Sequence, residues 1–346
     1  MNAYHSCVES LAKIIKNYRK GELPKELDEA HVIRWIEQFS EDSREMILAE
    51  TLHIFSEWYF DINRIREFLR EMYEYVTNLY LYSSEIVFLN CQQEGKSQAI
   101  LLDELHNIQP MHKDNKACHQ GKHLIYVDDG LYSGRHIVKD LKNLLSLNKY
   151  RHTISLDVFV MIGYSEGIHY VKAELEPLCC EKNIAFTLNT WKCLSNTKTI
   201  QYFDDGEEYF LDQDTLWPLF PQMRERDDIK NRIEGITGKK LHYCYREYFR
   251  HYKSRVFSSE EARTILEKEF LKQGQSILTD DSIGKGLYPL GFSAYPSLGF
   301  GSFCATAMNI SNTCPVVLWW GNIQKHGNAL DKWYPLLPRR TNGYQE

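Results

Sequence analysis

The spacing of apolar residues changes near residue 85 and again near residue 222. Over residues 1–80, apolar side chains recur at the three- and four-residue intervals of amphipathic helices, most clearly at 62–79. This spacing predicts three short helices followed by a longer one. A winged-helix-like unit and a helical cap that packs on the next domain both agree with the pattern, which does not distinguish them.

Between residues 84 and 220, short apolar runs alternate with helical stretches. The predicted strands are the apolar runs at 86–89, 124–127, 153–162 and 184–188. The predicted helices between them are the apolar-striped segments at 98–108, 137–145 and 166–182. Strands that alternate with helices of this length indicate a parallel sheet with crossover connections. The predicted fold class is therefore α/β.

The last third of the chain has a different character. Residues 222–240 are charged and predict a linker or surface helices, and Ser258 with Glu261 has the spacing of a capping box for a helix over 260–272. From residue 276 to 340, Gly, Pro, Asn and Trp punctuate short apolar runs. We therefore expect three parts: a helical part over 1–80, an α/β core over 81–221, and a loop-rich C-terminal extension over 222–346 that packs on the core.

Composition narrows the class of protein. Apolar residues make up 43% of the chain and charged residues 25%, as in globular proteins. The net charge of −6 argues against a general nucleic-acid coat but leaves room for a local basic groove. None of the nine cysteines forms a Cys-x-x-Cys pair, so we expect reduced thiols and no structural zinc site. Without a leader pattern or a long apolar window, a cytoplasmic protein with no membrane partner is expected.

The candidate chemistry centres on residues 124–137. An apolar run ends in Asp128-Asp129, and Ser133-Gly134-Arg135 then opens an amphipathic helix. Open α/β sheets bind ligands at the carboxyl ends of their strands, and a helix N-terminus offers free N–H groups to phosphate. Two acids beside such a turn suit a ribose 5-phosphate. The alternative is an ordinary strand-to-helix turn with solvated acids and a capping serine.

A second candidate is Gly95-Lys96-Ser97-Gln98, which follows the strand predicted at 86–89. As a Walker A loop it would need a glycine five residues before Gly95, where Asn90 stands. With 124–128 as a Walker B strand, a degenerate P-loop NTPase competes with the ribose-phosphate interpretation. The missing glycine weakens it, and a Walker B strand does not require Ser133-Gly134. A third interpretation also remains open: Lys96 stands at the start of an ordinary helix and binds no phosphate.

The pattern at 124–136 resembles the diphosphoribosyl-binding motif of type I phosphoribosyltransferases. The resemblance implies that Asp128 and Asp129 contact the ribose hydroxyls and act in catalysis, with Mg²⁺ as the expected cofactor and these acids as its candidate ligands. It implies a ribose-phosphate site formed by Gly130, Tyr132, Ser133, Gly134, Arg135 and His136. It implies a pyrophosphate site formed by Gly95, Lys96, Ser97 and Gln98. His136 departs from the threonine or serine that is usual in the motif.

Nearly the whole chain also resembles a bacterial phosphoribosyltransferase-like family associated with conflict and anti-phage defence systems. The resemblance rests on the order of four segments: 34–39, 95–98, 257–271 and the tail from 299 to 340. Within the tail it suggests Asn309, Asn312 and Arg339 as polar contacts. It implies an enzyme that binds phosphoribosyl pyrophosphate or a nucleotide and transfers the ribosyl phosphate or cleaves a glycosidic bond, as an effector or accessory protein of defence.

A binding module is the alternative from a different class. An inactive pocket would sense a nucleotide, while other surfaces would contact nucleic acid or a defence-system partner protein. The histidine at position 136 favours this alternative slightly, because it removes a small hydroxyl from the phosphate loop.

Overall fold

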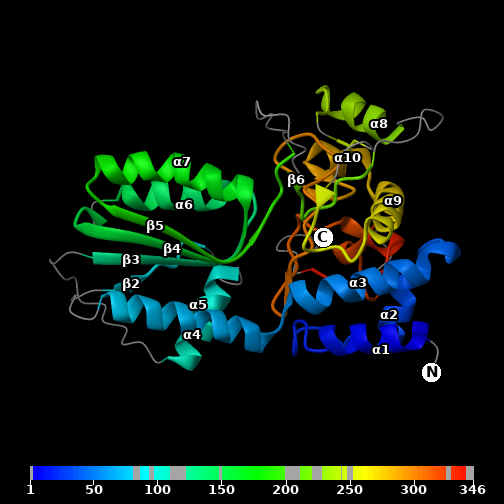
Figure 1. Cartoon of the computed structure of the whole chain (residues 1–346), viewed down its shortest axis with the longest axis horizontal. Helices are drawn as coiled ribbons and strands as arrows, with labels where there is room; N and C mark the ends of the chain where they lie inside the picture. The colour runs from blue at the N-terminus through cyan, green and yellow to red at the C-terminus, as the bar shows by residue number, and fades with distance from the viewer. Residues whose placement is uncertain are drawn as a thin grey trace. The chain divides into compact units, whose positions relative to one another are not determined.

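The computed structural model describes residues 3–80, 86–92, 97–109, 122–147, 150–198, 211–219, 228–242, 244–247, 252–324 and 329–339. Contacts divide the chain into two compact units, Ile62–Asn196 and Met1–Asp61 with Thr197–Glu346 (Figure 1). The second unit is therefore built from both ends of the chain. The division is coarser than the expected ranges 1–80, 81–221 and 222–346, which stay a prediction as domain bounds.

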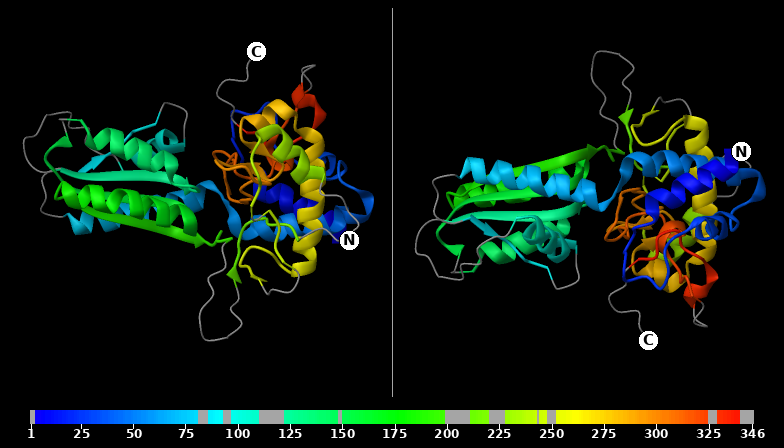
Figure 2. Two further views of the ribbon diagram at one scale, coloured as in Figure 1. Left: turned by 90° about the horizontal axis from the view of Figure 1, so that it is seen from above. Right: turned by 90° about the horizontal axis from the view of Figure 1, so that it is seen from below.

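The unit Ile62–Asn196 is a parallel sheet covered by helices. Its strands are β2 (Ile86–Phe88), β3 (Lys122–Leu131), β4 (Thr153–Tyr164) and β5 (Ala185–Leu194), hydrogen-bonded in that order and all parallel. Figures 1 and 2 show its helices on both faces of the sheet. On one face are α4 (Ile62–Leu79) and α5 (Ser97–Ile108), and on the other α6 (Arg135–Leu145) and α7 (Ser165–Glu181). The predicted α/β class with a parallel sheet is confirmed.

The core of this unit lies between the sheet and the helices α6 and α7. From the strands it takes Leu124, Tyr126, Leu156, Val158 and Val160, and from the helices Ile137, Leu141, Val171 and Leu175. Both faces of β3 and β4 are buried along most of their length, which is why these strands have continuous apolar runs rather than alternating ones. Burial of each large apolar side chain contributes about 1.5–3 kcal/mol.

Two strands, β3 and β5, continue well beyond the ends that the sequence predicts. The apolar run of β3 stops at Val127, but the strand continues to Leu131, with Asp128 opposite Val160 and Gly130 opposite Ile162. β5 likewise continues to Leu194 beyond its expected end at residue 188. In both places the long strand β4 supplies the backbone hydrogen-bond partners, so polar residues and a glycine stay in extended conformation. The two acids therefore lie inside the last residues of the strand rather than in a loop after it.

The other unit contains the N-terminal helices and the C-terminal segment. Its N-terminal elements are α1 (Ala3–Ile15), α2 (Glu29–Ile36), η1 (Glu41–Ser43), α3 (Arg44–Trp58) and β1 (Tyr59–Phe60). Its later helices are α8 (Asp228–Thr237), α9 (Glu260–Ile277), α10 (Asp280–Gly284), α11 (Val316–Trp319) and η3 (Ala329–Lys332). Its later strands are β6 (Leu211–Asp212), β7 (Tyr252–Lys253), β8 (Leu287–Tyr288), β9 (Gly291–Phe292) and β10 (Ala305–Thr306). These short elements confirm the loop-rich C-terminal region.

The last described residues pack against the N-terminal helices of this unit. The ring of His31 contacts the Tyr334 hydroxyl through Nδ1 and the Leu336 carbonyl through Nε2, both at 2.8 Å. Trp35 donates to the Val317 carbonyl, and β1 pairs with β10 in parallel. Within residues 3–80, β1 is the only strand, and the winged-helix interpretation stays a prediction. In the described part of the chain, no helix is both long and apolar enough to span a bilayer.

The predicted cap of α9 is wrong by one residue. The side chain of Ser259, not Ser258, accepts the hydrogen bond from the Ala262 backbone N–H, at 3.1 Å. Ser258 instead donates to the buried carboxylate of Glu50 through both its backbone N–H and its hydroxyl. A buried carboxylate needs donors, and this distant partner is not visible in the local sequence pattern.

Candidate functional site

The predicted site lies beyond the end of β2, beside the last residues of the neighbouring strand β3. The helix that follows β2 covers one face of the sheet, and the helix that follows β3 covers the other (Figure 1). The connections after these two neighbouring strands therefore leave in opposite directions. Ligands of open α/β sheets bind at such points, beyond the carboxyl ends of the strands.

Asp128, on β3, accepts hydrogen bonds from residues that follow β2. Its Oδ1 accepts hydrogen bonds from the Ser97 hydroxyl and the Asp129 backbone N–H, both at 2.9 Å. Its Oδ2 accepts from the Gln92 side-chain amide at 2.9 Å and from the Tyr126 hydroxyl at 3.3 Å. The carboxylate is only 6% exposed. Because each of its oxygens accepts two hydrogen bonds, Asp128 holds the chain after β2 against the end of β3. The ribose contact expected of Asp128 stays a prediction.

Asp129 differs from its neighbour because it is half-buried. Burial raises the pKa of both carboxyls, and the charge of Asp129 raises the pKa of Asp128 further. Two adjacent carboxylates in a poorly solvated place repel each other and hold a proton more tightly. A cation bound beside them would release that proton. The pair therefore suits a ligand that brings positive charge or hydroxyl donors.

The side chains of the first residues of α5 make hydrogen bonds to other residues of the protein. Gln98 is fully buried; its Oε1 accepts from the backbone N–H groups of Cys91 and Gln92, and its Nε2 donates to the Val127 carbonyl. Together with Ser97, it holds the chain after β2 against β3. The pyrophosphate contacts expected of Ser97 and Gln98 stay a prediction. Gly95 and Lys96 lie outside the described residues.

The short loop after β3 leads into the N-terminus of α6. Gly134 occupies the cap position with a φ of 71°, in the left-handed region that favours glycine, and no side chain caps the described helix there. The alternative of a capping Ser133 is therefore wrong. Ser133 is half-buried, and Arg135 and His136 are exposed in the first turn. The N–H groups of this turn are of the kind that binds phosphate in other proteins.

The loop is fixed by close packing on α7, which the sequence analysis missed. A Cβ atom at Gly167 would lie 2.0 Å from the Tyr132 carbonyl oxygen, and one at Gly134 would lie 2.5 Å from Val171 Cγ2. The Tyr132 ring also stacks on Tyr164, with centroids 5.5 Å apart. A glycine in the first turn of a predicted helix was the available signal. Gln92 and Tyr126 were missed as well, because nothing local marks a loop amide or a strand tyrosine as a carboxylate partner.

A sequence model of the PRTase-CE family matches residues 32–339. The chain belongs to the PRTase-CE family. The match covers most of the chain and includes both acids, the loop after β3 and the C-terminal segment. The family is phosphoribosyltransferase-like, in agreement with the parallel α/β sheet. No curated protein matches the sequence.

The PRTase-CE match also includes the C-terminal candidates, which belong to the other unit of the chain. Asn309 and Asn312 make backbone hydrogen bonds there, with the Thr306 hydroxyl and the Phe292 N–H respectively. Arg339 donates to the Ile310 carbonyl, and its guanidinium lies 5.5 Å from the Trp319 ring centroid. These contacts hold the C-terminal segment together. A role for the three side chains toward a ligand stays a prediction.

The acids of this PRTase-CE chain fit a magnesium ion only together with a ligand. Among the residues that the structure describes, no three His, Cys, Asp or Glu side chains gather as a metal site. Magnesium is usually bound through one or two carboxylates, with substrate phosphates and water completing its shell. Asp128 and Asp129 supply such a carboxylate pair. The phosphates of the ligand would have to supply much of the remaining coordination shell of the ion.

Proposed function

We propose that this PRTase-CE chain binds a ribose 5-phosphate ligand, phosphoribosyl pyrophosphate or a nucleotide, together with Mg²⁺, and breaks the bond at ribose C1. The observation that carries the proposal is the difference between the two acids. Asp128 is saturated by four donors that fix the strand ends, while Asp129 beside it is half-buried. One carboxylate is thus positioned by the other next to the turn that opens α6.

In the proposed reaction, the leaving group departs from C1 with the bonding electron pair. The leaving group is pyrophosphate from phosphoribosyl pyrophosphate, or the base from a nucleotide. The ribose then carries positive charge, which a fixed carboxylate stabilises best in a site that excludes water. The carboxylate of Asp129 supplies the stabilising negative charge and accepts hydrogen bonds from the ribose hydroxyls. An acceptor nitrogen or a water molecule then bonds to C1 and passes its proton to the pyrophosphate or base that has departed.

Other residues of the site would bind the two ends of the ligand that carry phosphate groups. The N–H groups of the first turn of α6, with Tyr132 to His136, would bind the 5-phosphate. The loop after β2, including Gly95 and Lys96, would bind the pyrophosphate, whose charge Mg²⁺ would neutralise when bound. Gln92, Ser97 and Asp128 act here through positioning, since their polar atoms bind one another.

The proposed biological role is that of an effector or accessory protein of bacterial anti-phage defence, acting in the cytoplasm. It rests on the resemblance to families associated with conflict systems. In this role the target would be nucleotides, and nucleic acid or a defence-system protein would be the partner. The P-loop NTPase alternative gains nothing from the family match, because the matching family is phosphoribosyltransferase-like.

A second candidate function is nucleotide sensing without turnover. Two observations favour it: the exposed His136 replaces a small hydroxyl of the motif, and the acceptor positions of Asp128 are filled by the protein itself. In this case the pocket would bind the ligand, and the bound state would be signalled to a partner.

One assay separates the candidates. Purified protein is incubated with Mg²⁺, phosphoribosyl pyrophosphate and a panel of nucleotides, and pyrophosphate, free base and γ-phosphate are measured. Turnover that is lost in Asp129→Asn and kept in Asp103→Asn, an exposed acid on α5, supports the enzyme. Tight binding without product supports the sensor. ATP hydrolysis that is lost in Lys96→Ala contradicts the leading proposal.

A further inference from the structure

The first turn of α7 packs against the loop after β3, which contains the proposed 5-phosphate site. A Cβ atom at Gly167 would lie 2.0 Å from the Tyr132 carbonyl oxygen, and one at Gly134 would lie 2.9 Å from the Gly167 carbonyl oxygen. The Tyr132 ring also stacks on Tyr164, the residue that precedes the helix. Because packed interiors have little free volume, a displacement of this loop displaces the first turn of α7 as well.

The same turn is also held by Asn196, the last residue of the sheet unit Ile62–Asn196. The side-chain oxygen of Asn196 accepts hydrogen bonds from the Glu166 backbone N–H at 3.0 Å and from the Ser165 hydroxyl at 3.1 Å. Ser165 Oγ in turn accepts from the Asn196 backbone N–H at 3.1 Å. The side chain at the cap position, Tyr164, makes no capping hydrogen bond, so Asn196 caps α7 from 30 residues further along the chain.

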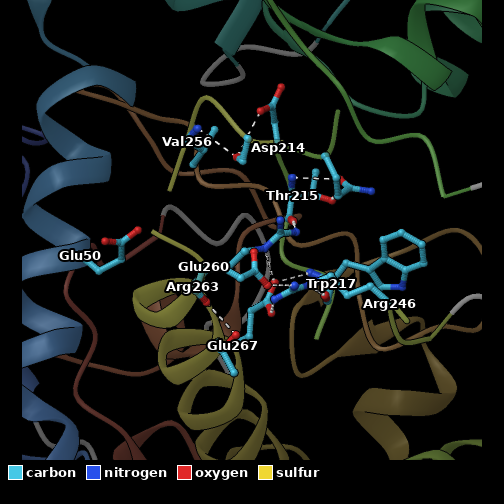
Figure 3. A network of polar contacts seen from close by, with 12 residues as sticks. Glu50, Asp214, Thr215, Trp217, Arg246, Val256, Glu260, Arg263 and Glu267 are labelled. Carbon is cyan, nitrogen blue, oxygen red and sulfur yellow. Dashed lines mark hydrogen bonds and ion pairs between the residues drawn. The ribbon is translucent and has the colours of Figure 1, made fainter. Parts of the chain in front are cut away.

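The next residue, Thr197, belongs to the other unit and is anchored there. Its carbonyl accepts a hydrogen bond from the side-chain amide of Gln213 at 3.2 Å. Gln213 is fully buried, and its side-chain oxygen accepts from the backbone N–H and the hydroxyl of Thr215. Arg263, whose side chain is only 1% exposed, donates to the Thr215 carbonyl at 3.0 Å (Figure 3). Residues 196 and 197 are thus both fixed by side-chain hydrogen bonds, each within its own unit, unlike the residues of a flexible linker.

We propose that Asn196 makes the connection between the two units respond to a ligand in the loop after β3. A phosphate bound by the N–H groups at the start of α6 fixes this loop, the loop fixes the first turn of α7, and that turn fixes Asn196. The inference rests on the proposed binding of a 5-phosphate. It deepens that proposal, because it assigns a route by which the occupied state of the site reaches the rest of the chain.

The alternative is that Asn196 is a cap that stabilises α7 and does nothing more. In that case, hydrogen exchange of the amides around Asn196 is independent of the ligand. In the proposed coupling, the ligand binds only while the first turn of α7 is closed, so bound ligand makes opening of the turn rarer. The response of these amides to a phosphate ligand therefore distinguishes the two roles.

Hydrogen exchange of two amides in the intact protein measures the coupling. The N–H groups of Glu166 and Asn196 are the backbone donors of the contacts around Asn196. Their exchange is followed residue by residue with Mg²⁺ and either ribose 5-phosphate or ribose, and binding of each compound is measured by calorimetry. Ribose 5-phosphate should slow exchange of both amides by the factor 1 + [L]/Kd, about fivefold at four times Kd, whereas ribose should not. The amide of Leu241, which donates to the Glu234 side chain in the other unit, should not respond.

Variants test whether the coupling depends on the Asn196 side chain. Asn196→Ala removes the acceptor of the Glu166 N–H, so exchange of that amide should become about fivefold faster, as expected for the loss of one hydrogen bond. Ribose 5-phosphate should then still protect Glu166 but no longer residue 196. Asn196→Asp keeps a side-chain oxygen as the acceptor and should behave like the parent. Asn189→Ala is the matched control and should also behave like the parent, because the Asn189 side chain donates to the Thr187 hydroxyl on the same strand, β5.

Failure of the coupling and failure of the proposed site give different results. If ribose 5-phosphate binds but leaves exchange of the Asn196 amide unchanged, or slows exchange of Leu241 equally, the coupling is overturned while the binding site stands. If it does not bind, the proposed site fails, and the route is tested without ligand. Gly167→Ala and Tyr132→Ala disturb the packing of the loop on α7, so each should speed exchange of the Asn196 amide, whereas Gly235→Ala should not. Unchanged exchange of that amide in the first two variants would overturn the route as well.

Discussion

The hydroxyl of Ser97, the first residue of α5, donates to the buried carboxylate of Asp128 at 2.9 Å. This hydrogen bond joins the helix after β2 to the end of β3. It makes the start of α5, which follows the loop proposed to bind pyrophosphate, depend on the acid that the sequence motif assigns to the ribose.

Ser97→Ala tests this dependence. Loss of a hydrogen bond to a buried carboxylate should lower the free energy of unfolding by about 1.5–3 kcal/mol, measured by urea denaturation. The affinity for phosphoribosyl pyrophosphate should fall as well, because the loop is no longer fixed. Ser133→Ala, at a serine outside this network of hydrogen bonds to Asp128, serves as the comparison. Equal stability of Ser97→Ala and the parent would show that this bond contributes nothing.

Asp129→Asn should stabilise the protein at neutral pH while it abolishes turnover. The folded pKa of Asp129 is raised by burial, so the unfolded chain loses its proton first as the pH rises. Stability therefore falls from about pH 4 upward through the folded pKa, and the asparagine variant lacks this fall. Tm is measured from pH 4 to 8 for both proteins. Asp103→Asn, an exposed acid, should follow the parent; a parallel curve for Asp129→Asn contradicts the argument.

His31 should make the unit formed by both ends of the chain less stable in mild acid. Burial lowers its pKa from 6.5 to about 4, and Tyr334 and Leu336 fix the neutral ring. As the pH falls from 6.5 to 4, the unfolded chain takes up a proton that the folded one refuses, so stability falls by up to about 3 kcal/mol. Urea denaturation between pH 4.5 and 7 measures this. His31→Gln should flatten the dependence, whereas His5→Gln, at an exposed histidine, should leave it in place.

Gly167→Ala should destabilise the loop after β3, which is the proposed 5-phosphate site. The added methyl group would meet the Tyr132 carbonyl at 2.0 Å, and backbone cannot move aside cheaply. We expect a loss of about 1–3 kcal/mol in unfolding free energy and weaker ligand binding. Gly235→Ala is the matched control, because a Cβ there meets nothing within 4 Å in α8. That variant should be about 0.5–1 kcal/mol more stable than the parent. Similar behaviour of the two variants would rule out the close contact.

Structure that depends on local interactions could be predicted from the sequence, whereas structure that depends on contacts between distant residues could not. Apolar periodicity predicted the strands and helices of the sheet unit, because burial imposes it locally. It missed the last four residues of β3, since Asp128 to Leu131 stay extended only through pairing with β4. The two acids and Gly134 were predicted from their local spacing. Gln92, Tyr126 and Gly167 act through partners far away in sequence, and the unequal roles of Asp128 and Asp129 depend on those partners.

The shared core of the two chain ends has a consequence for synthesis on the ribosome. Tyr18 and the helix α2 are synthesised well before their hydrogen-bond partners between Val317 and Pro338. At 5–20 residues per second, they wait on the order of tens of seconds for these partners. The sheet unit, whose residues are contiguous, can fold in the meantime. A nascent chain would therefore form the pair Asp128 and Asp129 before the other unit is complete, and a truncation before Val317 would leave α2 without these partners.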